Sequence, residues 1–167
     1  LRSRWIIRHK VGSAFTKDEI VSEEKDETFY TGIYKTKSKK FLIIGAGSTL
    51  TNHYQILDAN SPDGKFKEFS PRERGLEYSI DHYSDKFYVV TNLDAQNFRL
   101  METPDTKTAK ANWKEKIAHR KDTLLQGIEI FKDYMVLSER AQANTLMRVI
   151  DQKKKKKHYL NFGEPAY

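Results

Sequence analysis

Short runs of apolar, β-branched and aromatic residues recur along the chain, with turn-forming residues between them. The first complete set of four runs covers residues 29–34, 40–44, 54–58 and 65–69. Lys37-Ser38-Lys39 separates the first two runs, and Asn60-Ser61-Pro62-Asp63-Gly64, a strong turn signal, separates the last two. Short runs bounded by such turns predict β-strands.

The same set of four runs returns twice more at a nearly constant spacing. Aromatic residues mark the second run of each set at spacings of 46 and 47 residues: Phe41, Phe87 and Tyr134. They mark the fourth run at spacings of 47 and 46 residues: Phe66, Trp113 and Tyr159. The chain therefore contains an internal repeat of about 47 residues, each unit with four strands.

Four strands in a repeat of this length are typical of a β-propeller blade. We therefore predict an all-β fold, a partial β-propeller of about three four-stranded blades plus a half blade. The predicted units cover residues 1–23 (half blade), 29–70, 76–118 and 123–162 (blades), and 163–167 (start of the next blade). The half blade contributes a third strand at Trp5–Val11 and a fourth at Glu19–Val21. Because both ends fall at incomplete units, we expect a piece of a longer protein.

Blade stacking explains why the second runs are apolar throughout. A four-stranded blade buries both faces only against its neighbours, so its inner strands carry apolar residues on both sides. An arc of blades then leaves an apolar face at each end, near Phe29, Ile33, Phe41 and Ile43 at one end and near Tyr134, Val136, Met147 and Val149 at the other. Such faces predict that the fragment self-associates.

One stretch allows a second interpretation. Ala109, Trp113 and Ile117 lie four residues apart within 107–121, a spacing that read alone favours a surface helix. The repeat places Trp113 in the fourth strand of its unit. We therefore predict a strand at Trp113–Ile117, preceded by a long loop or a short turn.

Composition excludes several classes of function. The chain has no Cys, which excludes a disulfide framework, a thiolate metal site and a Cys nucleophile, and favours a cytoplasmic setting. Five charges of the net +7 lie in the run Lys153–Lys157, which leaves +2 for the rest and indicates a solvated loop. We expect no nucleic-acid partner, because the aromatic residues recur at the core positions of the repeat and do not alternate with basic residues on one exposed face. We expect no membrane partner, because no apolar stretch approaches the ~18 residues of a membrane span.

The residues that carry peptidase or metal chemistry are missing. No Gly-x-Ser-x-Gly elbow is present, and Gly45-Ala46-Gly47-Ser48-Thr49 reads as a strand connection, since no Lys-Ser/Thr pair or helix follows it. The five His stand singly, without the spacing of a metal site. We predict no catalytic residue, no metal site and no cofactor.

Two features remain as candidate binding residues. Ser70-Pro71-Arg72-Glu73-Arg74-Gly75 links a fourth strand to the next first strand, a connection that crosses toward the central channel of a propeller. Arg72, Glu73 and Arg74 form either an inter-blade ion-pair network or a contact with a substrate or a neighbouring domain. His82 follows Asp81 at the end of an inner strand, where it is either a buried strand residue or a charged group.

Several long stretches resemble oligopeptidase B (protease II), in the prolyl oligopeptidase family of serine peptidases. They occur in the family's order, and the best match is Pro71–His82. The others are Glu23–Tyr30, Lys35–Lys40, Gly47–Thr49, Leu57–Pro62, Asn97–Pro104, Asn112–Glu115, His119–Asp122, Phe131–Arg140 and Glu164–Tyr167. The run Lys153–Lys157 departs from the family pattern.

The resemblance implies a seven-bladed propeller over an α/β-hydrolase domain of the same parent chain. Such enzymes cleave short peptides after Arg or Lys with a Ser-His-Asp triad, and the propeller admits only small substrates. None of the triad positions falls in this chain, so we expect the fragment to be catalytically inert, with the hydrolase domain and short basic peptides as partners. The alternative is a free-standing propeller-like binding or scaffold protein.

Overall fold

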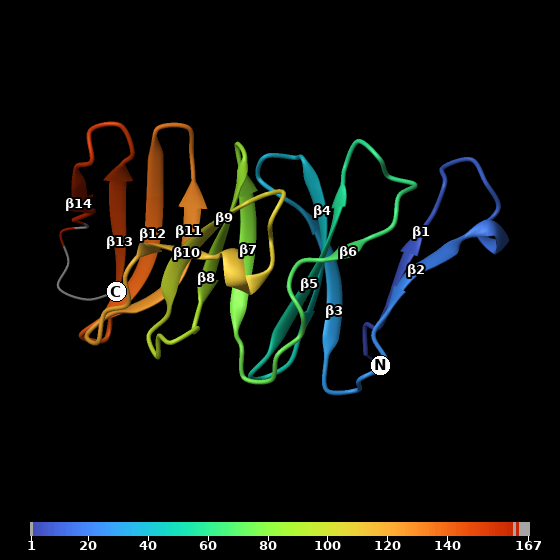
Figure 1. Ribbon diagram of the computed structural model, residues 1–167, viewed down its shortest axis with the longest axis horizontal. Helices are drawn as coiled ribbons and strands as arrows, with labels where there is room; N and C mark the ends of the chain where they lie inside the picture. The colour runs from blue at the N-terminus through green and yellow to red at the C-terminus, as the bar shows by residue number, and fades with distance from the viewer. Residues whose placement is uncertain (1, 162, 164–167) are drawn as a thin grey trace.

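A computed structural model describes residues 2–161 and 163, and it consists of β-sheets standing side by side (Figure 1). Within these residues there are fourteen strands in four sheets, two short 3-10 helices and no α-helix. The predicted all-β, partial propeller fold is confirmed. Phe162 and Glu164–Tyr167, which include most of the predicted start of a further blade, lie outside the described residues.

Each sheet is antiparallel and follows the chain order. The half blade is the hairpin of β1 (Trp5–Arg8) and β2 (Glu19–Glu23), with η1 (Phe15–Lys17) between them. The first blade contains β3 (Tyr30–Lys35), β4 (Phe41–Gly47), β5 (Asn52–Asp58) and β6 (Lys67–Glu68). The second contains β7 (Tyr78–Tyr83), β8 (Lys86–Thr91), β9 (Arg99–Pro104) and β10 (Lys114–Ile117), with η2 (Lys110–Asn112) before β10. The third contains β11 (Leu124–Ile130), β12 (Tyr134–Ala141), β13 (Asn144–Asp151) and β14 (Lys157–Tyr159).

Strand β8 shows why the middle blade needs apolar residues on both faces. Phe87 and Val89 pack into the core shared with the first blade. Their neighbours Tyr88 and Val90 pack into the core shared with the third. Successive side chains of a strand point to opposite faces, so a continuous apolar run buries both. The prediction that the second strand of a blade is buried on both faces by its neighbours is confirmed for β8.

The segment 107–121 forms a strand and not a helix. Three residues of 3-10 helix precede β10, which begins at Lys114, one residue after the predicted start. The indole of Trp113 packs beside Phe69 and Tyr78, and its Nε1–H donates to the carbonyl of Thr108 at 2.7 Å. The repeat was thus a better guide than the local helical spacing.

Two expectations about the first blade and the half blade are wrong in detail. Phe66 is half-buried, and the buried aromatic of this segment is Phe69, which is 1% exposed. After the Pro/Gly-containing turn, β6 pairs with β5 for only two residues, so Phe69 rather than Phe66 lies next to the second blade. Strand β1 ends at Arg8, short of the predicted Val11.

The apolar end faces are confirmed at one end and wrong at the other. On the third blade, Tyr134 is 46% and Met147 38% exposed, while Val136 and Val149 are half-buried. Of the four residues predicted for the face at the first blade, only Ile33 is exposed, at 50%. Phe41 and Ile43 pack toward the second blade, because the pleat turns odd-numbered positions of β4 that way, and Phe29 is buried beneath the guanidinium of Arg72.

Candidate functional site

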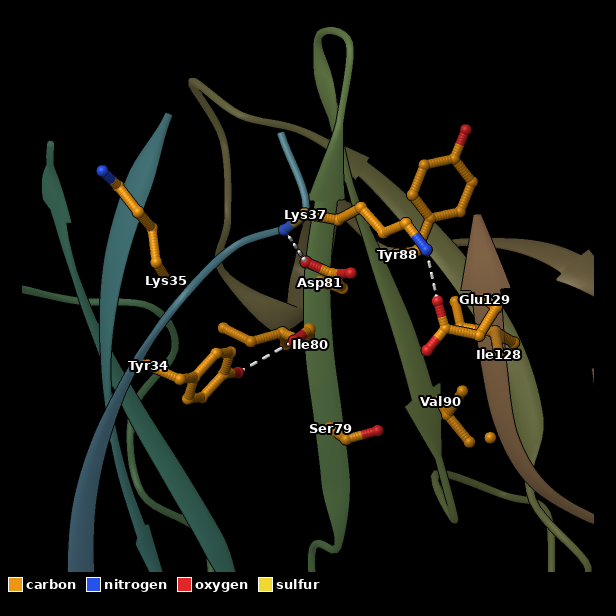
Figure 2. A pocket seen from close by; sticks show the side chains of 11 residues that line it. Tyr34, Lys35, Lys37, Ser79, Ile80, Asp81, Tyr88, Val90, Ile128 and Glu129 are labelled. Carbon is orange, nitrogen blue, oxygen red and sulfur yellow. Dashed lines mark hydrogen bonds and ion pairs between the residues drawn. The ribbon is translucent and has the colours of Figure 1, made fainter. Parts of the chain in front are cut away.

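The first strands of the three blades, β3, β7 and β11, are edge strands of their sheets, and a groove of about 510 Å³ opens between them (Figure 2). Its walls combine aromatic, aliphatic and carboxylate side chains. They include Tyr34, Ile80, Asp81, Tyr88, Ile128 and Glu129. Groups from three blades therefore meet at one place on the inner wall of the arc.

Lys37 spans this groove from the turn after β3. Its backbone N–H donates to Asp81 Oδ1 of the second blade at 2.9 Å, and its Nζ donates to Glu129 Oε2 of the third blade at 2.5 Å (Figure 2). The ammonium also lies 4.1 Å from the ring centroid of Phe131. One residue of the first blade thus contacts both following blades.

The first blade closes the free edge of β7. Three backbone carbonyls of β7 accept hydrogen bonds from that blade: Tyr78 from the Tyr54 hydroxyl (3.0 Å), Ile80 from the Tyr34 hydroxyl (2.9 Å) and His82 from the Ser38 N–H (3.1 Å). Burial raises the pKa of both tyrosines, that of Tyr54 to about 12, so the hydroxyls remain donors at neutral pH. An incoming peptide therefore meets side chains at β7 rather than open carbonyls.

His82 is a buried residue of the joint between the first and second blades. Its side chain is fully buried, between the rings of Phe41 and Phe87, each 4.8 Å away centroid to centroid. Burial lowers the pKa of His82, and the charge of Asp105 opposes that shift only in part. Lys40 binds Asp105 at 2.6 Å, so the carboxylate already has a cationic partner. Burial thus favours the neutral form of His82, and its position is that of a buried strand residue, one of the two interpretations of the sequence.

Ser38, His82 and Asp105 stand in the order of a Ser–His–Asp triad, but their surroundings are those of a structural joint. Ser38 Oγ lies 2.7 Å from His82 Nδ1, and His82 Nε2 lies 3.5 Å from Asp105 Oδ2, longer than a normal hydrogen bond. The serine oxygen also contacts Thr36 Oγ1 at 3.0 Å and the N–H of Lys40 at 3.2 Å. A nucleophile must reach its substrate, and these groups hold one blade against the next. We assign them no catalytic role.

The link between β6 and β7 places Arg72 and Glu73 in ion pairs between separate segments. The guanidinium of Arg72 pairs with the carboxylate of Glu24, in the link that enters the first blade. Burial opposes ionisation of Glu24, but the hydrogen bonds and charge of Arg72, together with the hydrogen bond from the Asp26 backbone N–H, hold the pKa of Glu24 below its usual value. Glu73 pairs with the ammonium of Lys110, beside β10. Both residues thus belong to the inter-blade network that the sequence offered as one alternative.

Arg74 differs from its neighbours. No ion pair of Arg74 occurs within residues 2–161 and 163, and its side chain lines a hollow of about 480 Å³ at one end of the first blade. The hollow also includes the turn between β4 and β5, where Leu50 is 63% exposed. An exposed cation beside an exposed aliphatic side chain is the composition of an interface rim.

Among the described residues, no group of three His, Cys, Asp or Glu side chains is arranged to hold a metal ion. None of the helices found there is long and apolar enough to cross a membrane.

Sequence reasoning missed the groove residues Lys37 and Glu129. Glu129 lies 92 residues after Lys37, so no local spacing connects them. A signal was present in the sequence, because Asp81 and Glu129 are each the single acidic residue of a first strand. A charge at such a position indicates a strand face that is open to water or to a ligand.

The sequence matches the family model of the prolyl oligopeptidase N-terminal β-propeller domain over residues 2–167. The chain belongs to the prolyl oligopeptidase family. It is similar to dipeptidyl aminopeptidase BI of Pseudoxanthomonas mexicana, with 36% identity over 168 residues that cover 100% of this chain and 23% of that protein. It is also similar to protease 2 of Moraxella lacunata, with 29% identity over 161 residues that cover 96% of this chain and 23% of that protein.

A solved structure of the prolyl oligopeptidase family gives the same fold. Oligopeptidase B from Leishmania major superposes with a TM-score of 0.88 at 22% identity, over 99% of this chain and 24% of that chain. The resemblance to oligopeptidase B and protease II that the sequence motifs indicated is confirmed. The chain spans about a quarter of the length of the relatives it matches.

Proposed function

We propose that this chain is the substrate-gating propeller portion of a longer serine peptidase that cleaves short peptides after Arg or Lys, and that the chain alone is catalytically inert. The observation that carries the proposal is the match to a propeller family model over residues 2–167, in a chain that spans 23% of its curated relatives. The catalytic residues and the α/β-hydrolase domain then belong to the remainder of the same protein.

The inner wall of the arc supports a gating role. Hydrogen bonds from the hydroxyls of Tyr34 and Tyr54 and from the backbone N–H of Lys37 attach the first blade to β7, so this part of the wall is held in place. A rigid wall excludes wide substrates sterically. Two carboxylates, of Asp81 and Glu129, and two ammonium groups, of Lys35 and Lys37, line that wall.

The relative from Pseudoxanthomonas mexicana suggests a second candidate activity. Its name is that of a dipeptidyl aminopeptidase, and its identity to this chain is 36%. Such an enzyme needs a free amino terminus on its substrate, whereas an endopeptidase that cuts after Arg or Lys does not. Mass analysis of the products from one Arg-containing peptide, with and without N-acetylation, distinguishes the two activities.

The proposal is tested first by the coding sequence beyond Tyr167. We expect a Gly-x-Ser-x-Gly elbow downstream, and we expect the complete protein to react with a serine-directed fluorophosphonate while the 167-residue chain does not. A stop codon directly after Tyr167 contradicts the proposal and favours the free-standing binding or scaffold protein. Stoichiometric labelling of one serine in the 167-residue chain contradicts its inertness.

A further inference from the structure

The groove between β3, β7 and β11 already contains a cation supplied by the chain itself. The ammonium of Lys37 lies between the carboxylate of Glu129 and the ring of Phe131, at 2.5 Å and 4.1 Å respectively. A carboxylate and an aromatic face are the two groups that bind ammonium and guanidinium ions in proteins. The observed contacts show that the groove has the chemistry and the space for a cationic group.

We propose that this groove is a subsite for the Arg or Lys side chain of a bound peptide, and that Lys37 is a built-in competitor which occupies the subsite when it is empty. The inference rests on the proposed function for the peptide nature of the ligand. The site itself is argued from the contacts of Lys37, Asp81, Glu129 and the aromatic walls.

Exchange of Lys37 for an incoming cation is cheap, because the ion pair is open to water. The side chains of Lys37 and Glu129 are 34% and 62% exposed. Exposed pairs of this kind contribute no more than about a fivefold change in an equilibrium constant. A guanidinium forms two parallel hydrogen bonds to one carboxylate, which an ammonium does not, so Arg is the stronger ligand for Glu129.

The main chain of Lys37 stays fixed while its side chain leaves. Its backbone N–H is bound to Asp81 Oδ1, and the same oxygen accepts the N–H of His82 at 2.8 Å. Only the flexible side chain therefore has to move. With Lys37 withdrawn, the groove keeps the carboxylates of Asp81 and Glu129 against one ammonium group, that of Lys35, and the rings of Tyr34 and Tyr88 are part of its walls (Figure 2).

The ligand binds through its side chain and not by adding a strand to β7. The carbonyls of Tyr78, Ile80 and His82 are already occupied by donors from the first blade. Addition of a strand needs free backbone groups along a sheet edge. The subsite therefore recognises the positive charge and the length of the ligand's side chain, and not its backbone.

Binding of N-acetyl-arginine amide to the protein, followed by NMR titration at low ionic strength, tests the proposal. We expect signals of groove residues to shift with the arginine probe and not with the uncharged, similarly shaped N-acetyl-citrulline amide. The Lys37→Met variant is expected to bind the arginine probe more tightly, by up to about fivefold, because the competitor is gone. The Glu129→Gln variant is expected to bind the arginine probe more weakly, by up to about fivefold, because the pair it removes is equally exposed.

Lys153→Met is the matched control. Lys153 also forms an exposed Lys–carboxylate pair, with Asp133 at 2.7 Å, so its replacement changes net charge equally but leaves the groove intact. We expect it to leave the affinity unchanged. The proposal is overturned if the two Met variants gain affinity equally, if Lys37→Met binds more weakly than wild type, or if Glu129→Gln binds as well as wild type.

This readout does not need peptidase activity. A complete protein that fails to cleave any peptide but binds the arginine probe in the groove contradicts the proposed function and supports the subsite. A complete protein that cleaves after Arg, with Glu129→Gln binding the probe normally, supports the function and contradicts the subsite. The two failures are therefore distinguishable.

Discussion

The ammonium of Lys37 and the carboxylate of Glu129 lie 2.5 Å apart although 92 residues separate them, one on the first blade and the other on the third. Within the described residues, the cores of the blades are shared only between neighbours. The turn after β3 and strand β11 nevertheless approach closely enough for Lys37 and Glu129 to meet (Figure 2). The inner wall is thus where one small molecule can contact three blades at once.

The aromatic core between the first and second blades carries much of the stability of the chain. Phe87 is fully buried and contacts the rings of Phe41 and Phe69, each 5.0 Å away centroid to centroid. We expect Phe87→Ala to lower the free energy of unfolding by about 3–5 kcal/mol, measured by urea denaturation. Val11→Ala, at a residue 93% exposed, is the control and should change it by less than about 0.5 kcal/mol. Equal effects of the two changes would contradict this packing.

The buried His82 makes stability depend on pH in a defined direction. Burial lowers its pKa in the folded state, so the unfolded chain, with a pKa of about 6.5, binds the proton more readily. The difference in free energy of unfolding between wild type and His82→Asn should be constant above pH about 6.5. It should decrease as the pH falls from there toward the lowered pKa, by at most about 1.4 kcal/mol per pH unit. A difference that grows on acidification would mean that His82 is protonated in the fold, with Asp105 as its partner.

The outward face of the third blade predicts self-association of the 167-residue chain. Tyr134 and Met147 are exposed on one side of this sheet, next to the half-buried Val136 and Val149. We expect light scattering at several concentrations to show a dimer or a larger species, and Val136→Lys to reduce it. Thr106→Lys adds the same charge at an exposed turn of the middle blade and should leave the association unchanged. Wild-type chain that stays monomeric at high concentration would contradict the prediction.

Arg74 and Leu50 are the residues that we expect to contact the hydrolase domain in the complete protein. Arg74 lies in a hollow beside the exposed Leu50 and has no ion pair among the described residues. Arg74→Glu should lower the melting temperature of the complete protein while leaving that of the 167-residue chain unchanged, because only the former has the interface. Arg72→Glu, which breaks the pair with Glu24, should destabilise both. If Arg74→Glu lowers the melting temperature of both proteins equally, or of the 167-residue chain alone, Arg74 stabilises the blade itself and not an interface.

The fold was predictable because the same four-strand pattern occurs three times in the sequence. Each copy therefore supports the strand assignment of the other two. The spacing of Phe41, Phe87 and Tyr134 set the second strands, and the position of Trp113 overrode a local helical pattern. Predictions that depended on which way a side chain points were weaker. Phe41 and Ile43 were assigned to a bare face, but a shift of one position along a strand exchanges its two faces.

The candidate site was predictable only in part. The link with Arg72 and Glu73 stood out locally, and one of its two interpretations, the inter-blade network, describes their contacts. The groove did not stand out, because its residues come from three repeats and meet only through the curvature of the arc. Carboxylates on first strands, such as Asp81 and Glu129, were the available signal, but locally only His82, the neighbour of Asp81, stands out.

The central claim is that this chain gates access to a serine-peptidase active site according to the size of the substrate. The most direct test measures kcat/KM of the complete protein for one Arg-containing sequence presented in three forms: a short peptide, a long unfolded peptide and a loop of a folded protein. We predict a high kcat/KM for the short peptide, a much lower kcat/KM for the long peptide and no cleavage of the folded protein. Where cleavage occurs, we predict that it follows the Arg residue. Equal kcat/KM for the three forms would contradict the claim.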